Sequence, residues 1–143
     1  VALTEKLGLE ENVWTLKGRD AIYSKIASML SQAKNHVLLC SNPQGIARKL
    51  KVHKNELERA GSRGVRIHVL SGVNPKELAK AGELAKVFEH VPRELPTRFV
   101  LCDDDALIFL TEEKSDPEDE IGVWIRSPHF ANTLKQVAGI EKK

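Results

Sequence analysis

The first half of the chain alternates short apolar runs with stretches whose apolar residues recur at helical spacing. Alternating polar and apolar positions predict a strand over 13–16, and apolar residues from Ile22 to Ala33 recur every three or four positions, which predicts an amphipathic helix. The run at 37–40, within the strand predicted over 36–41, is apolar on both faces, as a central strand covered by helices would be. Helical spacing then resumes at 46–60 and stops at Gly64, so the order strand, helix, strand, helix is expected.

The pattern after Gly64 predicts two more strands with a short helix between them. An apolar run at 65–70 predicts the first strand. Asn74-Pro75 followed by Glu77 supplies an N-cap, a first-turn proline and an acidic third position, so a short helix should begin there and end near Gly82. The segment 85–91 predicts a weaker strand, because its apolar residues are adjacent rather than alternating.

Two neighbouring apolar runs later in the chain predict a β-hairpin. They span 98–102 and 106–110 and are separated by three aspartates, a composition typical of a tight turn, so the two strands should pair antiparallel. The acidic segment 112–120 is expected to be a solvated loop. A strand is predicted over 121–125, and Ser127-Pro128 then begins a final helix.

This succession of elements predicts a mixed α/β fold. Strands that alternate with helices form right-handed βαβ crossovers and pair in parallel, whereas the later hairpin adds antiparallel strands. We therefore expect a mixed, largely parallel sheet with helices on both faces. No internal repeat or long linker divides the sequence, so residues 1–143 are expected to form a single domain. Because the chain opens with Val1 rather than Met, it is expected to be part of a longer protein.

The composition narrows the class of protein. Hydrophobic residues make up 41% and charged residues 29% of the 143, which are ordinary values for a globular domain. The formal net charge of +2 is too small for the phosphate contacts of a nucleic-acid-binding protein, so DNA contact by this chain is not expected. No apolar run approaches the roughly 20 residues that cross a bilayer, and no signal sequence opens the chain. Cys40 and Cys102 fall in predicted buried strands and are expected to be free thiols, which favours the cytoplasm.

None of the five histidines has a sequence neighbour that would make it a metal ligand or a general base. His68 is expected to satisfy a hydrogen bond at a sheet edge. The other four lie at element ends or on helix surfaces, where solvated or capping roles dominate: His36, His53, His90 and His129. No pair of histidines has the spacing of a helical zinc site, the acidic segment lacks the glycine of a calcium loop, and no glycine pattern forms a phosphate cradle. We expect neither a metal nor a cofactor.

The stretch from Pro96 to Thr111 contains a basic residue, Arg98, at the start of a predicted buried strand, and an aspartate at the turn that follows the strand. This arrangement resembles the phospholipase D superfamily motif His-x-Lys-x-x-x-x-Asp, which is followed by Gly-Ser and then Asn. Placed on that motif, the chain has Pro96 for the His, Arg98 for the Lys, Asp103 for the Asp, Leu110 for the Gly, Thr111 for the Ser and Glu113 for the Asn. The resemblance implies that the His is the nucleophile, and proline has no side-chain nucleophile. The segment therefore keeps a positive charge but lacks the reacting group.

Three short segments indicate a family when they are taken in their order along the chain. Val13-Trp14-x-x-Lys17-Gly18-Arg19 precedes the first long helix, Arg63-Gly64-Val65-Arg66-Ile67 forms the second helix-to-strand turn, and Arg98-Phe99-Val100 leads into Asp103-Asp104. In this order they resemble the regulatory domain of the TrmB-like archaeal transcriptional regulators. The resemblance implies an upstream winged-helix DNA-binding domain, followed by a phospholipase-D-like domain that has lost catalysis and serves effector sensing and dimerisation.

These observations favour a non-catalytic effector-sensing and dimerisation domain of a transcriptional regulator. Open α/β sheets bind ligands at the carboxyl ends of their parallel strands, which nominates as ligand-binding residues Ser41, Asn42, Ser71, Arg98 and Asp103. The expected partners are a second copy of the chain, a small-molecule effector, and DNA only through the upstream domain; no membrane contact is expected. Two alternatives stay open: a phosphodiesterase or nuclease with a rearranged site, and a purely structural dimerisation module.

Two sets of residues have a structural alternative. Arg98 could hold an anion or a sugar hydroxyl with Asp103 orienting it, or the two residues could only cap the ends of a hairpin strand. The apolar positions of the final helix could form a dimer contact or belong to the core: Phe130, Leu134 and Val137.

Overall fold

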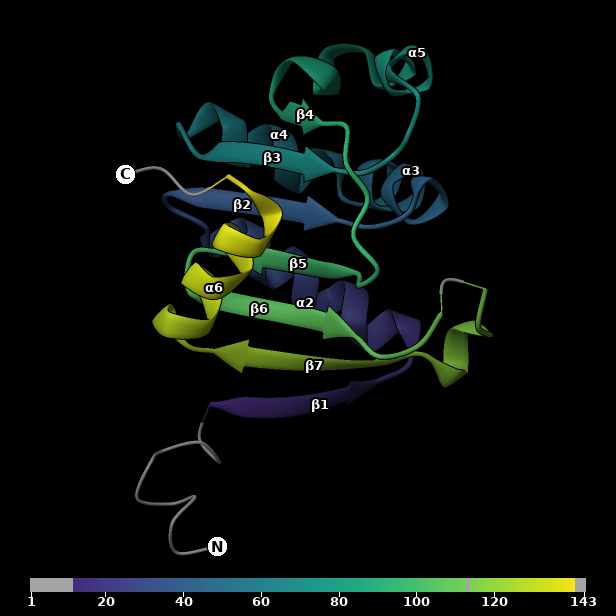
Figure 1. The fold of residues 1–143 in the computed structure, drawn as a ribbon, viewed down its shortest axis with the longest axis vertical. Coiled ribbons are helices and arrows are strands. Elements are labelled where there is room, and N and C mark those ends of the chain that lie inside the picture. Colours follow the sequence, from purple (N-terminus) through teal and green to yellow (C-terminus); the bar gives the residue numbers. More distant parts are fainter. Residues whose placement is uncertain (1–11, 113, 141–143) are drawn as a thin grey trace, which may run out of the picture.

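A seven-stranded sheet runs through the computed structural model of the chain, which describes residues 12–112 and 114–140 (Figure 1). Its strands are β1 (Val13–Lys17), β2 (His36–Cys40), β3 (Arg66–Leu70), β4 (Glu89–Val91), β5 (Phe99–Cys102), β6 (Asp105–Phe109) and β7 (Ile121–Arg126). They lie in the order β1-β7-β6-β5-β2-β3-β4. The two halves of the chain therefore meet inside the sheet, where β2 contacts β5.

Pairing within this sheet is mostly antiparallel. β2 pairs with β3 and β3 with β4 in parallel, whereas β1 with β7, β7 with β6, β6 with β5 and β5 with β2 are antiparallel pairs. The mixed α/β fold is confirmed, but the expectation of largely parallel pairing is wrong for the described strands. The reason is that β5, β6 and β7 follow one another without a crossover helix, and such connections join antiparallel neighbours.

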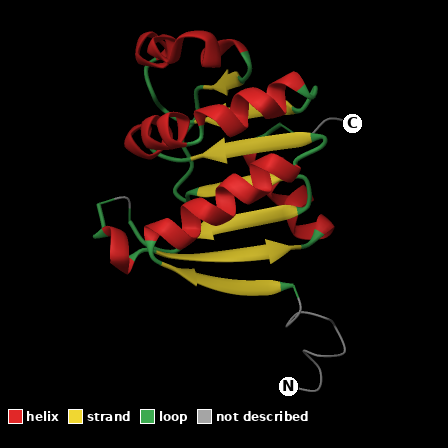
Figure 2. Ribbon diagram, turned by 180° about the vertical axis from the view of Figure 1, so that it is seen from behind, coloured by secondary structure: helices red, strands yellow, loops and turns green. Residues whose placement is uncertain are grey.

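Helices cover both faces of the sheet, as predicted. Three long helices lie on one face, α2 (Arg19–Gln32), α3 (Pro43–Val52) and α4 (Lys54–Ser62), and α6 (Pro128–Ala138) lies on the other (Figure 2). The connection from β3 to β4 holds the single turn α5 (Pro75–Leu78) and the 3-10 segment η1 (Ala79–Lys86), and a 3-10 turn η2 (Pro117–Asp119) precedes β7. Of the described helices, none is long and apolar enough to cross a membrane.

The strand β2 separates two hydrophobic clusters. Val37 and Leu39 belong to the cluster under α2, α3 and α4, whereas Leu38 and Cys40 belong to the cluster under α6. Because successive side chains of a strand point to opposite faces, a strand that is covered on both faces must be apolar at every position. The continuous apolar run at 37–40 predicted this burial, and these four residues are at most 1% exposed.

Two elements differ from their prediction in extent. The helical pattern at 46–60 predicts one helix, but α3 ends and α4 begins at His53, whose φ of −106° and ψ of 23° leave the helical geometry. The strand predicted over 85–91 shortens to β4, because the residues before it continue η1. Gly64 does follow the end of α4 with a positive φ of 89°, as its position predicts.

The acidic segment 112–120 is not solvated throughout its length. Its last residue, Glu120, is 2% exposed, and its carboxylate accepts hydrogen bonds from Nε (2.9 Å) and Nη2 of Arg19. A buried carboxylate without a partner would strongly destabilise the fold, and this guanidinium supplies the partner. The pair also ties the start of α2 to the entry of β7.

Candidate functional site

The degenerate motif lines a pocket of about 520 Å³, which we call the motif pocket. Four of the motif positions contribute to its wall: Pro96, Arg98, Leu110 and Thr111. The antiparallel hairpin explains why they meet, since Arg98 directly precedes β5 and Leu110 directly follows β6. The Phe109 N–H donates to the carbonyl of Arg98 at 3.0 Å and closes this end of the hairpin. These four motif positions are therefore close in space although the two pairs are separated in the sequence.

The side chain of Arg98 contacts Thr111 and Phe109 at the open end of the hairpin. Its Nη2 donates to the carbonyl of Thr111, and its guanidinium carbon lies 4.7 Å from the ring centroid of Phe109. Lys49, which is only 1% exposed, places its Nζ 4.4 Å from the same ring. Cation–π contacts of this kind stabilise a desolvated cation. The pocket thus has one positive group whose direction is set before any ligand arrives.

The charges of the described residues that line the motif pocket balance. Its charged lining residues are Arg98 and Lys114 on the basic side and Glu94 and Glu112 on the acidic side. Lys114 and Glu112 also pair with each other at 3.7 Å. No histidine lines the pocket, and Pro96 occupies the position of the motif nucleophile. Glu113, the residue at the asparagine position of the motif, lies outside the described residues.

Three of the other nominated residues lie at the same edge of the sheet as Arg98. Asn42 lines the pocket, and its Oδ1 accepts from Gly45 N–H at 2.8 Å, which caps α3. Ser41 follows β2 and is 2% exposed, and its hydroxyl makes no hydrogen bond within the described part of the chain. Ser71 follows β3 and is fully buried, and its Oγ accepts from Val73 N–H at 3.2 Å. Asn42 and Arg98 are thus the nominated residues that line the pocket.

Asp103 lies at the opposite end of β5, away from Arg98. Its carboxylate accepts hydrogen bonds from the backbone N–H groups of Lys34 (2.9 Å), Asn35 (3.0 Å) and His36 (3.0 Å). Its φ of 55° places it in the left-handed region, which aspartate adopts more readily than most residues. The structure therefore does not bring Asp103 together with Arg98; it places Asp103 where it fixes the turn that leads into β2.

A pair of histidines joins the start of β2, at His36, to the middle of β3, at His68. His36 Nε2 lies 3.0 Å from His68 Nδ1, and His68 Nε2 lies 3.4 Å from a carboxylate oxygen of Glu89 on β4. The expectation that His68 lies at a sheet edge is wrong, because β3 is paired on both sides. The two histidines are 32 residues apart in sequence, so only the parallel pairing of β2 with β3 brings them together. No local sequence signal marks this pair, because His36 begins β2 whereas His68 lies in the middle of β3.

The environment of this pair is basic. Burial lowers the pKa of His36 to about 4, and the charges of His68, Lys135 and Arg66 act in the same direction, against an opposing effect of Asp103. Such an imidazole is neutral at physiological pH. No three histidine, cysteine, aspartate or glutamate side chains of the described residues converge as metal ligands would.

The two cysteines are free thiols in the described structure, as predicted. Burial raises the pKa of the Cys40 thiol to about 11 and also raises the pKa of the Cys102 thiol. A thiol must lose its proton to act as a nucleophile or a metal ligand. Both cysteines therefore act as small apolar core residues at neutral pH.

Several solved structures share this fold. An archaeal chromatin protein, TrmBL2, superposes with a TM-score of 0.71 at 22% identity over 90% of this chain and 50% of its own. NucT from Helicobacter pylori gives a TM-score of 0.61 at 11% identity, over 90% of this chain and 93% of its own. Phosphatidylserine synthase from Haemophilus influenzae gives 0.67 at 12% identity, over 90% of this chain and 36% of its own. The fold is therefore phospholipase-D-like, and the chain spans about half the length of the TrmBL2 chain.

Sequence comparison adds the family. No curated protein sequence matches the chain. The family model described as "Transcriptional regulator TrmB, EBD N-terminal subdomain" matches residues 12–137, which include every described strand and nearly all of α6. With this match over most of its length, the chain belongs to the TrmB family of transcriptional regulators. It corresponds to the N-terminal subdomain of the domain that the family calls the effector-binding domain (EBD).

Proposed function

We propose that this chain is the effector-sensing and dimerisation domain of a transcriptional regulator and that it binds its effector without chemical turnover. Its family supports a regulatory role. DNA would be bound by a separate domain of the regulator, since the net charge of +2 gives this chain no strong attraction for phosphates.

The motif pocket is the observation that carries this proposal. It keeps the wall positions of a phospholipase-D-like site, including the basic Arg98, while Pro96 replaces the nucleophile and no histidine lines it. A phosphodiesterase that forms a covalent intermediate needs that nucleophile. The motif pocket is therefore proposed to bind a ligand without reacting with it.

The balanced charges favour a polar, uncharged effector. Arg98 offers a planar donor fork, and the carboxylates of Glu94 and Glu112 offer acceptors. A phosphodiester would meet repulsion from the two carboxylates as well as attraction to Arg98. Ser41 Oγ, next to the lining residue Asn42, is buried without a hydrogen bond in the described chain, so a ligand or water that reached it would relieve an energetic cost.

A thermal-shift screen of uncharged polar metabolites tests the sensing role. A ligand at 100 times its Kd should stabilise the chain by about 2.7 kcal/mol, and Arg98→Ala should remove this stabilisation. Arg59→Ala is the matched control, because Arg59 is an exposed arginine of α4 that does not line the pocket. If no metabolite stabilises the chain, the purely structural module replaces the sensor. If the chain hydrolyses a chromogenic phosphodiester in an Arg98-dependent manner, the enzymatic reading replaces it.

Dimerisation rests on the family and on one exposed apolar residue. Leu134 is 8% exposed and packs in the cluster under α6 with Phe130, whereas Val137 on the same helix is 49% exposed. Mass measurement by light scattering should give twice the chain mass, and Val137→Glu should lower it if α6 forms the contact. A monomer at all concentrations would remove dimerisation from the proposal.

A further inference from the structure

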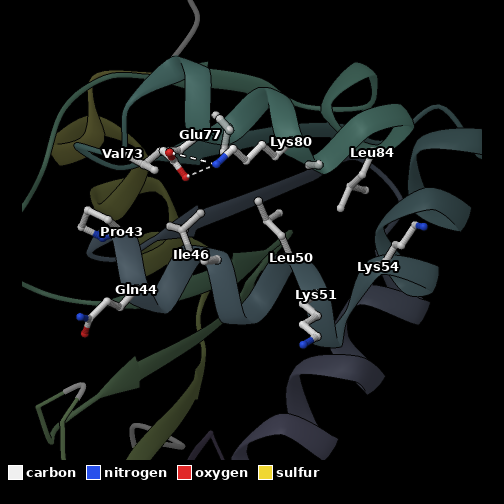
Figure 3. A pocket seen from close by; sticks show the side chains of 13 residues that line it. Pro43, Gln44, Ile46, Leu50, Lys51, Lys54, Val73, Glu77, Lys80 and Leu84 are labelled. Atoms are coloured by element: carbon white, nitrogen blue, oxygen red, sulfur yellow. Dashed lines mark hydrogen bonds and ion pairs between the residues drawn. The ribbon is translucent and has the colours of Figure 1, made fainter.

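An apolar groove of about 550 Å³ opens between α3 and the α5–η1 segment, and of its described lining residues it shares Gln44 with the motif pocket (Figure 3). We call it the α3–η1 groove. Ile46 and Leu50 point into it from α3, and Val73 and Leu84 face them from the connection between β3 and β4. Its volume falls within the usual range for small-molecule sites, and its lining is mainly apolar, as such sites are.

The irregular backbone of the β3–β4 connection explains why the groove stays open. In a βαβ unit, a long helix normally covers the neighbouring layer, but α5 has four residues and η1 is interrupted at Gly82 (φ 65°, ψ −127°). These short turns do not extend along the full length of α3. Ala47 of α3 consequently remains exposed on the groove wall, and Val73 and Ala81 are only partly buried.

Lysines make one end of the groove positive. Lys51 and Lys54 lie toward the Leu84 end, away from Val73, and both are exposed. Neither forms an ion pair with another residue of the described chain. Lys80 on the opposite rim is already paired with Glu77 at 3.2 Å. The groove therefore joins an apolar channel to two amines that have no counter-ion in the described structure.

We propose that the α3–η1 groove binds a small aliphatic carboxylate, with its chain along Leu50 and Val73 and its acid group at Lys51 and Lys54. The apolar channel accounts for the chain and the two lysines for the acid group. An exposed carboxylate–ammonium contact contributes little by itself, so burial of the chain supplies most of the affinity and the lysines set the orientation. The residues that would hold this ligand do not line the motif pocket, although Gln44 lines both.

Calorimetric titration of the 143-residue chain with hexanoate, octanoate and decanoate tests the apolar channel. Kd is expected to fall about fourfold for each added CH₂, which corresponds to about 0.8 kcal/mol. A Kd that does not change with chain length overturns the proposal. Arg98→Ala is expected to leave decanoate binding unchanged; if it abolishes binding, the ligand occupies the motif pocket and the groove assignment is wrong.

Variants of α3 test the location. Ala47→Trp should fill the groove and weaken decanoate binding at least tenfold, whereas Val52→Trp, on an exposed residue of the same helix that does not line the groove, should leave it unchanged. If Ala47→Trp instead halves the mass of the chain in solution without affecting decanoate, the groove is an interface between two copies and the proposal fails.

A charge comparison remains informative even if the tryptophan variant folds poorly. The double change Lys51→Ala and Lys54→Ala should weaken decanoate binding several-fold and leave 1-decanol binding unchanged, because only the acid group contacts the lysines. Equal losses for the acid and the alcohol would show that the lysines do not recognise a carboxylate, and no loss for either would place the ligand elsewhere.

Discussion

Replacing Asp103 by alanine tests whether this residue of the degenerate motif holds the fold together. Its carboxylate accepts three backbone N–H groups that lead into β2, at 2.9 to 3.0 Å. Two of the donors, on Lys34 and Asn35, are exposed and can bond to water after the change, whereas the His36 N–H is partly buried. Loss of a hydrogen bond to a charged group costs about 1.5–3 kcal/mol, so the His36 contact dominates.

The backbone of Asp103 adds a second contribution. At a φ of 55°, alanine is strained by about 1 kcal/mol relative to glycine, which adopts this region freely. We therefore expect Asp103→Ala to lose about 3 kcal/mol and Asp103→Gly about 2 kcal/mol. Asp103→Asn keeps one acceptor oxygen and tolerates the left-handed region, so it should lose only about 1 kcal/mol.

Urea unfolding followed by circular dichroism measures these differences. With a slope of about 2 kcal/mol per molar urea, Asp103→Ala should lower the midpoint by roughly 1–2 M. Asp104→Ala is the matched control, because Asp104 is exposed and its side chain has no hydrogen bond in the described structure. Equal urea midpoints for Asp103→Ala and Asp104→Ala would contradict a structural role of the Asp103 carboxylate. If Asp103→Ala has normal stability but no longer binds the effector, Asp103 is a ligand-binding residue.

Two further predictions concern buried polar groups. Arg19→Ala should cost about 3–5 kcal/mol, because it leaves the carboxylate of Glu120 buried without its cation, and adding Glu120→Gln should recover part of the loss; equal midpoints for wild type and Arg19→Ala would contradict this. Burial lowers the pKa of His53 to about 4, so the unfolded chain takes up the proton first as the pH falls below about 6.5, and His53 should account for a stability loss of about 2 kcal/mol between pH 7 and pH 5, in addition to the loss from His36, whose pKa is lowered in the same direction. His53→Phe, which can still pack against Tyr23, should reduce this dependence in unfolding curves and leave the part that His36 contributes, whereas His129→Gln, at an exposed histidine, should not change it; parallel curves for all three proteins would refute the assignment.

The local elements could be predicted well because their signals lie within a few residues of one another. Asn74 and Ser127 accept hydrogen bonds from the N–H groups of Lys76 and Phe130, and their sequence context predicted the starts of α5 and α6. The hairpin of β5 and β6 was likewise predictable from two apolar runs around a three-aspartate turn. The break at His53 was not, since its apolar neighbours keep helical spacing on both sides.

The candidate site could be predicted only in part. The motif segment identified Arg98 and Pro96 as neighbours at one end of a hairpin, and both line the motif pocket. The same linear motif also contains Asp103, which the extended strand β5 carries to the opposite end of the sheet. Asp103 follows Arg98 by only five positions, which suggested that the two side chains are close. A strand advances about 3.3 Å per residue, so β5 separates them.

The order of most strands and helices, the burial of β2 and the loss of the nucleophile at the motif could all be predicted from the amino acids. These properties follow from side-chain periodicity, capping and residue chemistry, all of which act locally. Which strands are neighbours became known only from the folded chain, and the Arg19–Glu120 and His36–His68 pairs and the α3–η1 groove depend on that arrangement. Such contacts join residues that are tens of positions apart, and they depend on how β2 and β5 bring the two halves of the chain together, which no local pattern encodes.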